Sequence, residues 1–176
     1  MIDELNLQHK IRQLLGCPDL EIALREEWAS TEPNHRNHLH QEIELRNPKK
    51  EFNSSISHCT LMGGIALSRF PIGLDIEVRH RVEWPIVQRV STLEEVALAT
   101  EPSALWCAKE AAFKALKKYS QPSVISEISI GGWQKIDSQT EKYQLLNSAH
   151  FHSPAANKGL IIHDGDLTIS FFIFCP

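Results

Sequence analysis

The sequence lacks closely spaced cysteines, a long apolar run and an excess of positive charge. Its four cysteines stand far apart, which excludes a Cys-x-x-Cys zinc signature and a small secreted disulfide framework and favours a reducing, cytoplasmic setting. The formal net charge of −4 argues against a general nucleic-acid-binding protein, since such proteins are usually basic. No run approaches the length of a transmembrane helix, and the acidic start of the chain is not typical of a signal peptide. We therefore expect neither a nucleic-acid nor a membrane partner.

The composition favours a packed domain. Apolar residues make up 42% of the 176 residues and charged residues 23%, which predicts a folded core rather than disorder, in one domain or in two small halves. Leucines and an isoleucine at helical spacing predict a helix over residues 5–15, ended by Gly16 and Pro18. Residues 20–28 favour a short strand or helix, and residues 31–41 favour a polar loop or the entry of a helix.

The middle of the chain changes from strand patterns to helix patterns. Three short apolar runs separated by turn residues predict neighbouring strands over residues 55–59, 63–69 and 72–78. Residues 85–100 then indicate one helix or two short ones. The strongest helical pattern of the chain follows over residues 101–119, with a proline in its first turn.

The last third of the chain is typical of strands. Residues 125–136 alternate in polarity, with Ile125 among the expected core positions and Gly131–Gly132 as a bend or bulge. Asp164–Gly165 predicts a hairpin turn between two apolar runs. Strands, then helices, then strands again predict an α+β domain.

The stretch GLDIE, residues 73–77, contains two carboxylates two positions apart. On a strand, Asp75 and Glu77 project to the same side, with Leu74 and Ile76 on the opposite, buried side. Two carboxylates on one face repel each other unless a cation lies between them, and oxygen ligands at this spacing suit a hard ion such as Mg²⁺. An acidic pair that faces solvent at the end of a strand is the other interpretation.

The helical stretch WCAKEAAFKAL carries Glu110 and Lys114 four positions apart, so both lie on one helix face. In isolation, the pair is explained by a surface ion pair worth about a few tenths of a kcal/mol. Trp106 and Phe113 flank the pair, however, which is more typical of a polar site set into an apolar edge. Cys107 has no evident partner base, and we interpret it as a packing residue.

Two histidine-containing stretches require interpretation. Ser57-His58 ends a predicted strand, where a histidine is commonly a surface residue but, beside a serine, is also suited to hydrogen-bond a phosphate. The stretch HRNHLH, with His35, His38 and His40, suggests either metal binding or, more simply, a solvated loop or helix edge.

Taken in order, three motifs resemble the 4′-phosphopantetheinyl transferase superfamily. The family shows patterns like F-N-x-S-H, then G-[VIL]-D-[IVL]-E, then W-x-x-K-E-A-x-x-x-K. The matching residues here are Phe52, Asn53, Ser57, His58, Gly73, Asp75, Glu77, Trp106, Lys109, Glu110, Ala111 and Lys114. The resemblance spans roughly residues 52–133, nearly half of the chain.

The resemblance implies an enzyme that transfers the 4′-phosphopantetheine arm of coenzyme A to a serine hydroxyl of an apo acyl or peptidyl carrier protein, with release of adenosine 3′,5′-bisphosphate. By motif match, Asp75, Glu77 and Glu110 are expected to hold Mg²⁺. Glu110, or a water near it, is expected to take the serine proton, and Lys114 is expected to neutralise phosphate charge. The expected contacts with coenzyme A are Ser57, His58, Lys109 and Lys114.

The resemblance also implies an α+β fold of two small, pseudo-related α/β halves with antiparallel strands packed on helices. We expect a shortened N-terminal half over residues 1–70 and a C-terminal half over residues 71–176 that carries the Asp-x-Glu and Trp-x-x-Lys-Glu-Ala motifs. Arg36, Lys49 and Lys50 are candidate contacts for the 3′-phosphate of the nucleotide. The sequence leaves open whether the protein is a monomer or a homo-oligomer.

Two other functions stay open from the sequence. One is a catalytically reduced relative that acts as a binding or regulatory protein, and the other is a Mg²⁺-dependent hydrolase of a pyrophosphate compound. The presence of every expected carboxylate argues against lost activity, whereas the shortened N-terminal half argues for it. Because carrier proteins of this class are typically acidic, we also expect a basic or apolar docking surface. The candidates for it are Arg79, Arg81, Lys117 and Lys118.

Overall fold

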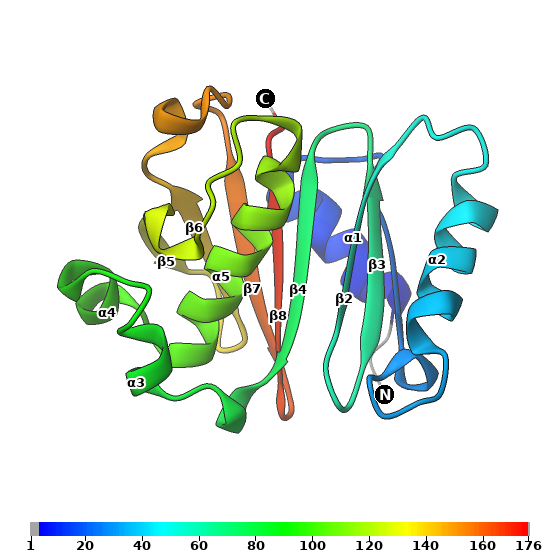
Figure 1. Cartoon of the computed structure of the whole chain (residues 1–176), viewed down its shortest axis with the longest axis horizontal. Coiled ribbons are helices and arrows are strands. Elements are labelled where there is room, and N and C mark those ends of the chain that lie inside the picture. The colour runs from blue at the N-terminus through cyan, green and yellow to red at the C-terminus, as the bar shows by residue number, and fades with distance from the viewer. Residues whose placement is uncertain (1–3, 176) are drawn as a thin grey trace.

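A computed structural model describes residues 4–175 of the chain (Figure 1). The first part forms α1 (Glu4–Leu15), β1 (Glu21–Arg25), a 3-10 turn (Glu26–Trp28), α2 (His35–Arg46), β2 (Asn53–His58) and β3 (Gly63–Ser68). The central part forms β4 (Ile72–Val78), a 3-10 turn (Arg79–Arg81), α3 (Trp84–Val87), α4 (Leu93–Leu98), α5 (Pro102–Ala115) and two 3-10 turns (Leu116–Lys118 and Ile125–Glu127). The last part forms β5 (Ile130–Lys135), β6 (Thr140–Leu145), a 3-10 turn (Ser148–Phe151), β7 (Lys158–Asp164) and β8 (Leu167–Ile173).

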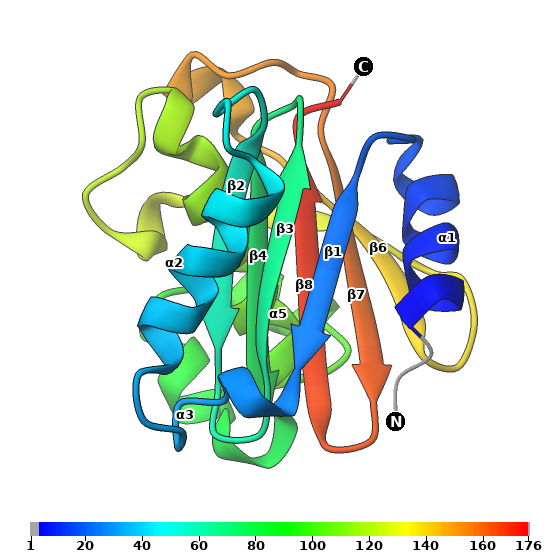
Figure 2. The same ribbon diagram turned by 90° about the vertical axis from the view of Figure 1, so that its right-hand side faces the viewer.

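Two antiparallel sheets lie side by side (Figures 1 and 2). Three strands pair in the order β1-β3-β2, and five strands pair in the order β4-β8-β7-β6-β5. The strands of the first sheet all precede residue 71, and those of the second sheet all follow it. The α+β class is confirmed. The expected structural similarity between the two halves of the chain stays a prediction.

Helices cover the sheets from both sides. α5 packs on β4 and β8, and α2 contacts β3, while α1 lies on the opposite side against β1 and β7 (Figures 1 and 2). Ile11 and Leu15 of α1 share one buried cluster with Leu74 and Ile76 of β4. A second cluster lies on the other side of the larger sheet, where Phe172 packs with the apolar residues of α5.

Serine side chains join the two sheets, because β2 and β4 face each other where the sheets meet. The backbone N–H of Leu74 donates a hydrogen bond to Ser55 Oγ over 2.9 Å, and the N–H of Ile76 donates to Ser57 Oγ over 3.1 Å. Residues two apart on a strand point to the same side, so both serines of β2 project toward β4. The two hydroxyls accept hydrogen bonds from buried amides of β4 that would otherwise need the backbone of a neighbouring strand as a partner. The end of β2 therefore lies beside Asp75.

Most elements predicted from the sequence are confirmed. The helix over residues 5–15 is α1, the helix over residues 101–119 is α5 with the 3-10 turn that follows it, and residues 85–100 form two short helices. The polar segment over residues 31–41 belongs mainly to α2, a helix that continues to Arg46.

The strand predicted over residues 125–136 begins later than expected. A 3-10 turn occupies Ile125–Glu127, and β5 starts at Ile130. The bulge is confirmed, since the register of β5 and β6 shifts after Gly131 and Gly132 has a φ of 64°. Across residues 4–175, no helix combines the length and the apolar character needed to cross a membrane.

Candidate functional site

Small residues allow β4 and α5 to approach each other closely. A Cβ atom at Gly73 would overlap the carbonyl oxygen of Ala111, so glycine is required at this position. The helix presents a row of buried alanines to the protein interior. They are Ala104, Ala108, Ala111, Ala112 and Ala115. The close approach brings Asp75 of β4 to the turn of α5 that carries Glu110 and Lys114.

Asp75, Lys114 and Ser57 form a hydrogen-bonded cluster where β2, β4 and α5 meet. Lys114 Nζ lies 2.8 Å from Asp75 Oδ1, and it also donates to the carbonyl oxygen of Leu74 over 2.9 Å and to Ser57 Oγ over 3.2 Å. Ser57 Oγ donates to the same Asp75 Oδ1 over 3.0 Å. The Asp75 side chain is only 7% exposed, so water screens the pair weakly. The structure thus brings together three of the residues expected at the site.

Glu77 and Glu110 lie half-buried near the same cluster. Burial raises the pKa of the Glu77 carboxyl, and the nearby charge of Asp75 raises it further. Burial and then the charge of Asp75 likewise raise the pKa of Glu110, although Lys114 opposes this effect. Lys114 forms its ion pair with Asp75 rather than with Glu110, so the surface pair considered from the sequence is not what holds this lysine. Three carboxylates therefore share one region with a single engaged lysine.

The cluster offers an open position to a cation. Asp75 Oδ2 is buried and accepts no hydrogen bond of good geometry from the described residues, although the thiol of Cys107 lies near enough to Asp75 to interact with it. An unpaired carboxylate oxygen among like charges is where a hard cation lowers the electrostatic energy, and Mg²⁺ prefers such oxygen ligands. In residues 4–175, no three side chains of His, Cys, Asp or Glu lie close enough together to hold a metal ion as they stand. The donor set suits Mg²⁺ in kind, with Asp75 Oδ2 as its open ligand.

Lys109 lies outside this cluster. Its side chain is fully buried, and its ammonium pairs with Glu95 Oε1 over 2.7 Å and donates to the carbonyl oxygen of Ile128. Burial lowers the pKa of Lys109, while the hydrogen bond and charge of Glu95 oppose that shift. Because the ammonium is fully buried and paired with Glu95, the structure does not bring Lys109 together with Asp75 and Lys114. This lysine stabilises the packing of α4 against α5.

His58 lies in cationic surroundings. Its ring makes an edge contact with His35 of α2, with 4.5 Å between the ring centroids. Burial lowers the pKa of His58, and the neighbouring His35, Arg36 and Lys114 lower it further. Its Nδ1 atom is buried and has no hydrogen-bond partner among residues 4–175. The ring is thus held neutral in a region whose positive neighbours suit an anionic ligand.

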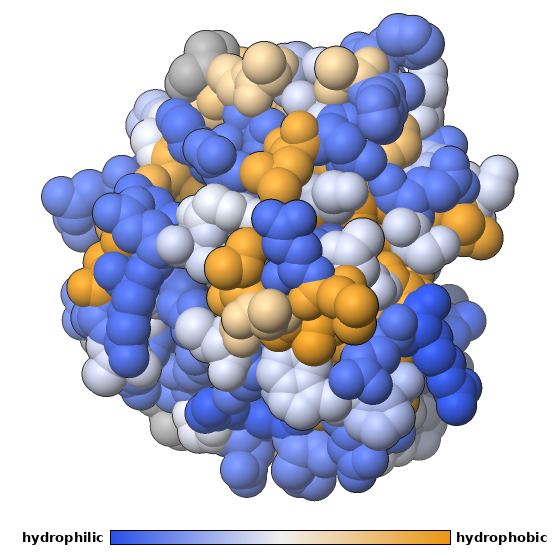
Figure 3. All heavy atoms as spheres, turned by 90° about the vertical axis from the view of Figure 1, so that its left-hand side faces the viewer, coloured by the Kyte–Doolittle hydropathy of each residue, from blue (hydrophilic) through white to orange (hydrophobic). Residues whose placement is uncertain are grey.

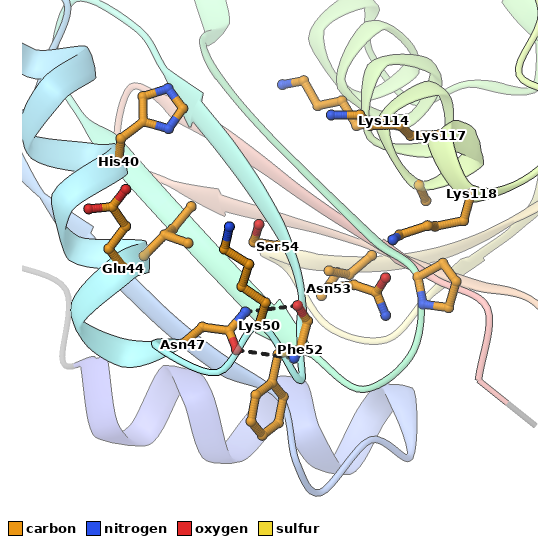
Figure 4. Close-up of a pocket in the computed structure, with 14 residues that line it drawn as sticks. His40, Glu44, Asn47, Lys50, Phe52, Asn53, Ser54, Lys114, Lys117 and Lys118 are labelled. Atoms are coloured by element: carbon orange, nitrogen blue, oxygen red, sulfur yellow. Dashed lines mark hydrogen bonds between the residues drawn. The ribbon is translucent and has the colours of Figure 1, made fainter.

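A cavity of about 460 Å³ opens beside the cluster, between α2 and the C-terminal end of α5 (Figure 4). Figure 4 shows Lys114, Lys117 and Lys118 entering it from α5 and the segment after it, with Lys50 reaching in from the loop before β2. Glu44 is the acidic residue among those that line it. The other lining residues are His40, Ile43, Asn47, Phe52, Asn53, Ser54, Pro71, Ile72 and Ala115. Four lysines facing one acid give the cavity a positive character.

Cys107 and two of the histidines in HRNHLH lie close to the cluster or to the cavity. Cys107 is buried beneath the carboxylates, and burial together with the charges of Asp75 and Glu77 raises its pKa well above the usual value, so the thiol stays protonated. Of the histidines in HRNHLH, His35 contacts His58 and His40 lines the cavity.

Comparison of the chain with known protein families and with curated proteins finds no match. The function proposed below therefore rests on the motifs and on the geometry of the site.

Proposed function

We propose that the protein transfers the 4′-phosphopantetheine group of coenzyme A to a serine hydroxyl of an apo acyl or peptidyl carrier protein, in a Mg²⁺-dependent reaction that releases adenosine 3′,5′-bisphosphate. The observation that carries this proposal is the Asp75–Lys114 ion pair at the edge of a lysine-lined cavity, with Glu77 and Glu110 near enough for the charge of Asp75 to raise the pKa of each. Carboxylates for a cation and lysines for phosphates are the two halves of a phosphoryl-transfer site.

The cavity supports coenzyme A as the donor. Its volume of about 460 Å³ lies within the range of small-molecule sites. Lys50, Lys117 and Lys118 would neutralise phosphates of the nucleotide. Lys114, which also lines the cavity, lies near enough to His58 to lower the pKa of its ring. A chain with a net charge of −4 needs such a local basic region to hold an anionic ligand.

Asp75, Glu77 and Glu110 would hold the magnesium ion. When bound, Mg²⁺ neutralises the charge that develops on the pyrophosphate oxygens. Lys114 lines the cavity and is held by Asp75, Ser57 and Leu74, which engage all three protons of its ammonium. In this arrangement, Lys114 contributes its positive charge to the phosphates rather than a free hydrogen bond.

Glu110 is suited to act as the general base. In the metal-free protein, burial and then the charge of Asp75 raise the pKa of Glu110, so its surroundings favour uptake of a proton by this carboxylate. In the transfer, the carrier serine oxygen forms a bond to the phosphorus next to the pantetheine arm. The bond from that phosphorus to the bridging oxygen breaks, and adenosine 3′,5′-bisphosphate leaves with the electron pair. The serine proton passes to Glu110, directly or through a water molecule.

A surface for the carrier protein is available on the face that carries α3 and α4. Ile86 of α3 and Leu93 and Leu98 of α4 are exposed there, and Figure 3 shows apolar side chains gathered among charged ones on this face. Arg81 is exposed nearby, whereas Arg79 is held by Glu101 over 2.6 Å. An acidic carrier would meet both apolar and basic groups, and its binding is expected to weaken as salt is added.

One assay tests the proposal. The protein is incubated with coenzyme A, Mg²⁺ and several apo carrier proteins, and mass spectrometry detects the added phosphopantetheine group. A labelled carrier supports the transferase. Cleavage of coenzyme A without labelling favours a pyrophosphate hydrolase, and binding of coenzyme A by calorimetry without cleavage favours a binding or regulatory protein. If coenzyme A is neither bound nor cleaved, the proposed function is wrong.

A further inference from the structure

Ser57 lies at the end of β2, between the strand that carries Asp75 and the helix that carries Lys114. This residue is only 6% exposed. The resemblance implies that this serine contacts coenzyme A, but the hydrogen bonds around it point to another role. We propose that Ser57 is a positioning residue, which presets the carboxylate of Asp75 and the ammonium of Lys114 and does not contact the ligand.

The hydroxyl of Ser57 has no capacity left for a ligand. A serine hydroxyl offers one proton and two lone pairs. The amide N–H of Ile76 and the ammonium of Lys114 are donors only, so they take the two lone pairs, over 3.1 and 3.2 Å. The carboxylate of Asp75 is the acceptor in contact, so the proton goes to its Oδ1 over 3.0 Å. Every hydrogen-bonding position of Ser57 is therefore filled by the protein.

These bonds determine which atoms of the site stay available. Asp75 Oδ1 is held from two sides, by Ser57 and by Lys114, so the carboxylate cannot turn freely and presents its unpaired Oδ2. Lys114 is held by three acceptors, of which Ser57 is one. Removing the hydroxyl takes away one of the two groups that hold Asp75 Oδ1 and leaves one ammonium proton of Lys114 without a protein partner. When a protein loses a residue that hydrogen-bonds a metal-binding side chain, its metal affinity or activity typically falls by roughly 10- to 100-fold.

Ser55 provides a matched control. It lies on the same strand, is similarly buried at 7% exposed, and accepts the N–H of Leu74 over 2.9 Å at the same joint between the sheets. Both serines therefore support β4 in the same way, but the hydrogen bonds of Ser55 involve neither Asp75 nor Lys114 among the described residues. Comparing Ser57→Ala with Ser55→Ala separates positioning of the site from support of the joint.

The kinetic experiment rests on the proposed function. With coenzyme A, Mg²⁺ and an apo carrier protein, Ser57→Ala is expected to lower kcat by roughly 10- to 100-fold and to leave the KM for coenzyme A within about twofold of the wild-type value. Ser55→Ala is expected to keep both values near those of the wild type. A raised KM with an unchanged kcat would mean that Ser57 contacts coenzyme A, and equal effects of the two variants would mean that only the joint matters. Either result overturns the inference.

Crystal structures of the two variants test the same inference without any activity. In Ser55→Ala, Lys114 Nζ and Asp75 Oδ1 should stay at the ion-pair distance of 2.8 Å. In Ser57→Ala, the carboxylate should rotate and the pair should open. An unchanged pair in Ser57→Ala overturns the inference even if kcat falls. If the wild-type protein labels no carrier, the proposed function fails, and the crystal structures still decide whether Ser57 positions these two groups.

Discussion

Lys109 pairs with Glu95 over 2.7 Å in a fully enclosed position, with side-chain exposures of 0% and 6%. The same carboxylate accepts the N–H of Ile130 over 2.8 Å and the N–H of Thr92 over 2.8 Å. The ammonium also donates to the carbonyl oxygen of Ile128. One ion pair therefore connects α5 to the start of α4 and to the segment that leads into β5.

Lys109→Met is expected to destabilise the protein by about 3–5 kcal/mol, because it leaves the buried charge of Glu95 without a partner. Urea unfolding measures the effect. The double variant Lys109→Met, Glu95→Gln removes that orphaned charge and should recover part of the loss. A loss well below about 1 kcal/mol in the single variant would show that the ion pair contributes little to the fold.

Glu110→Gln is expected to abolish transfer while the fold stays intact, since glutamine cannot accept the serine proton. Glu27→Gln provides the control, because Glu27 is an exposed glutamate in the 3-10 turn after β1, outside the proposed site and the proposed carrier surface. Mass spectrometry of the carrier measures transfer, and circular dichroism checks the fold. Near-normal transfer by Glu110→Gln would contradict the role of Glu110 as the general base.

The same substitution should make the protein more stable at neutral pH. Burial and the charge of Asp75 raise the pKa of Glu110 in the folded protein above its ordinary value of 4.5, so folding favours the protonated form. That contribution is fully present below the unfolded value and is lost as the pH rises through the folded value. In the absence of Mg²⁺, Glu110→Gln should therefore melt at a higher temperature than the wild type at neutral pH.

Thermal unfolding at two pH values tests this sign. The advantage of Glu110→Gln should shrink near pH 4.5, the ordinary pKa of a glutamate, because the raised pKa leaves more than half of the folded wild-type carboxyls protonated there. Glu77→Gln is expected to behave in the same way, since burial and then Asp75 also raise the pKa of Glu77. If both variants melt below the wild type at neutral pH, the carboxylates at the site do not destabilise one another as inferred here.

Lys50 and Lys49 are neighbours in the chain, but Lys50 lines the cavity and Lys49 is not among its lining residues. Lys50→Gln removes one positive charge from the proposed nucleotide site and should raise the KM for coenzyme A several-fold, more strongly at low salt. Lys49→Gln changes the net charge equally and should leave that KM nearly unchanged. Equal effects would mean that overall charge, rather than the cavity, attracts the nucleotide.

Gly73→Ala is expected to disturb both the fold and the site. The added Cβ would overlap the carbonyl oxygen of Ala111, so α5 must move away from β4. Overpacking of this kind typically costs about 1–3 kcal/mol or more, as urea unfolding would measure, and the shift would separate Glu110 from Asp75. Gly165→Ala provides a comparison, since Gly165 has a positive φ of 55° and open space around it. An alanine there strains the backbone without overlapping a neighbour, so it should cost stability but leave the packing of α5 on β4 unchanged. A crystal structure of Gly73→Ala with unchanged packing of α5 on β4 would contradict this account.

Local patterns in the sequence predicted the elements that depend on local spacing. Apolar runs bounded by turn residues found β2, β3 and β4, and the alanine-rich pattern found α5. The start of β5 was placed too early because tertiary contacts override the alternation there. The carbonyl oxygen of Ile128 and the N–H of Ile130 are taken by Lys109 and Glu95, which holds the preceding residues in a turn.

Residues that contact each other within the site lie far apart in the sequence, so local sequence patterns do not predict which of them pair. Lys114 is four residues from Glu110, yet it pairs with Asp75, which lies 39 residues away. The sequence analysis did not predict that Ser55 and Ser57 join the two sheets. The two serines stand two positions apart on a strand, on either side of Ile56, and this spacing places both hydroxyls on one face. Lys109 and Glu110 adjoin in the motif, but the helix turns their side chains toward different surroundings.

The joint between β2 and β4 also protects the molecule from aggregation. Each of these strands lies at the end of its sheet, and an end strand with free amides is a template on which another chain can build. Here the two ends face each other, and the serine hydroxyls occupy the amides of Leu74 and Ile76. The outer ends are β1, a strand of five residues, and β5, which is interrupted by the irregularity after Gly131. Short and irregular outer strands resist the addition of a strand from a second molecule.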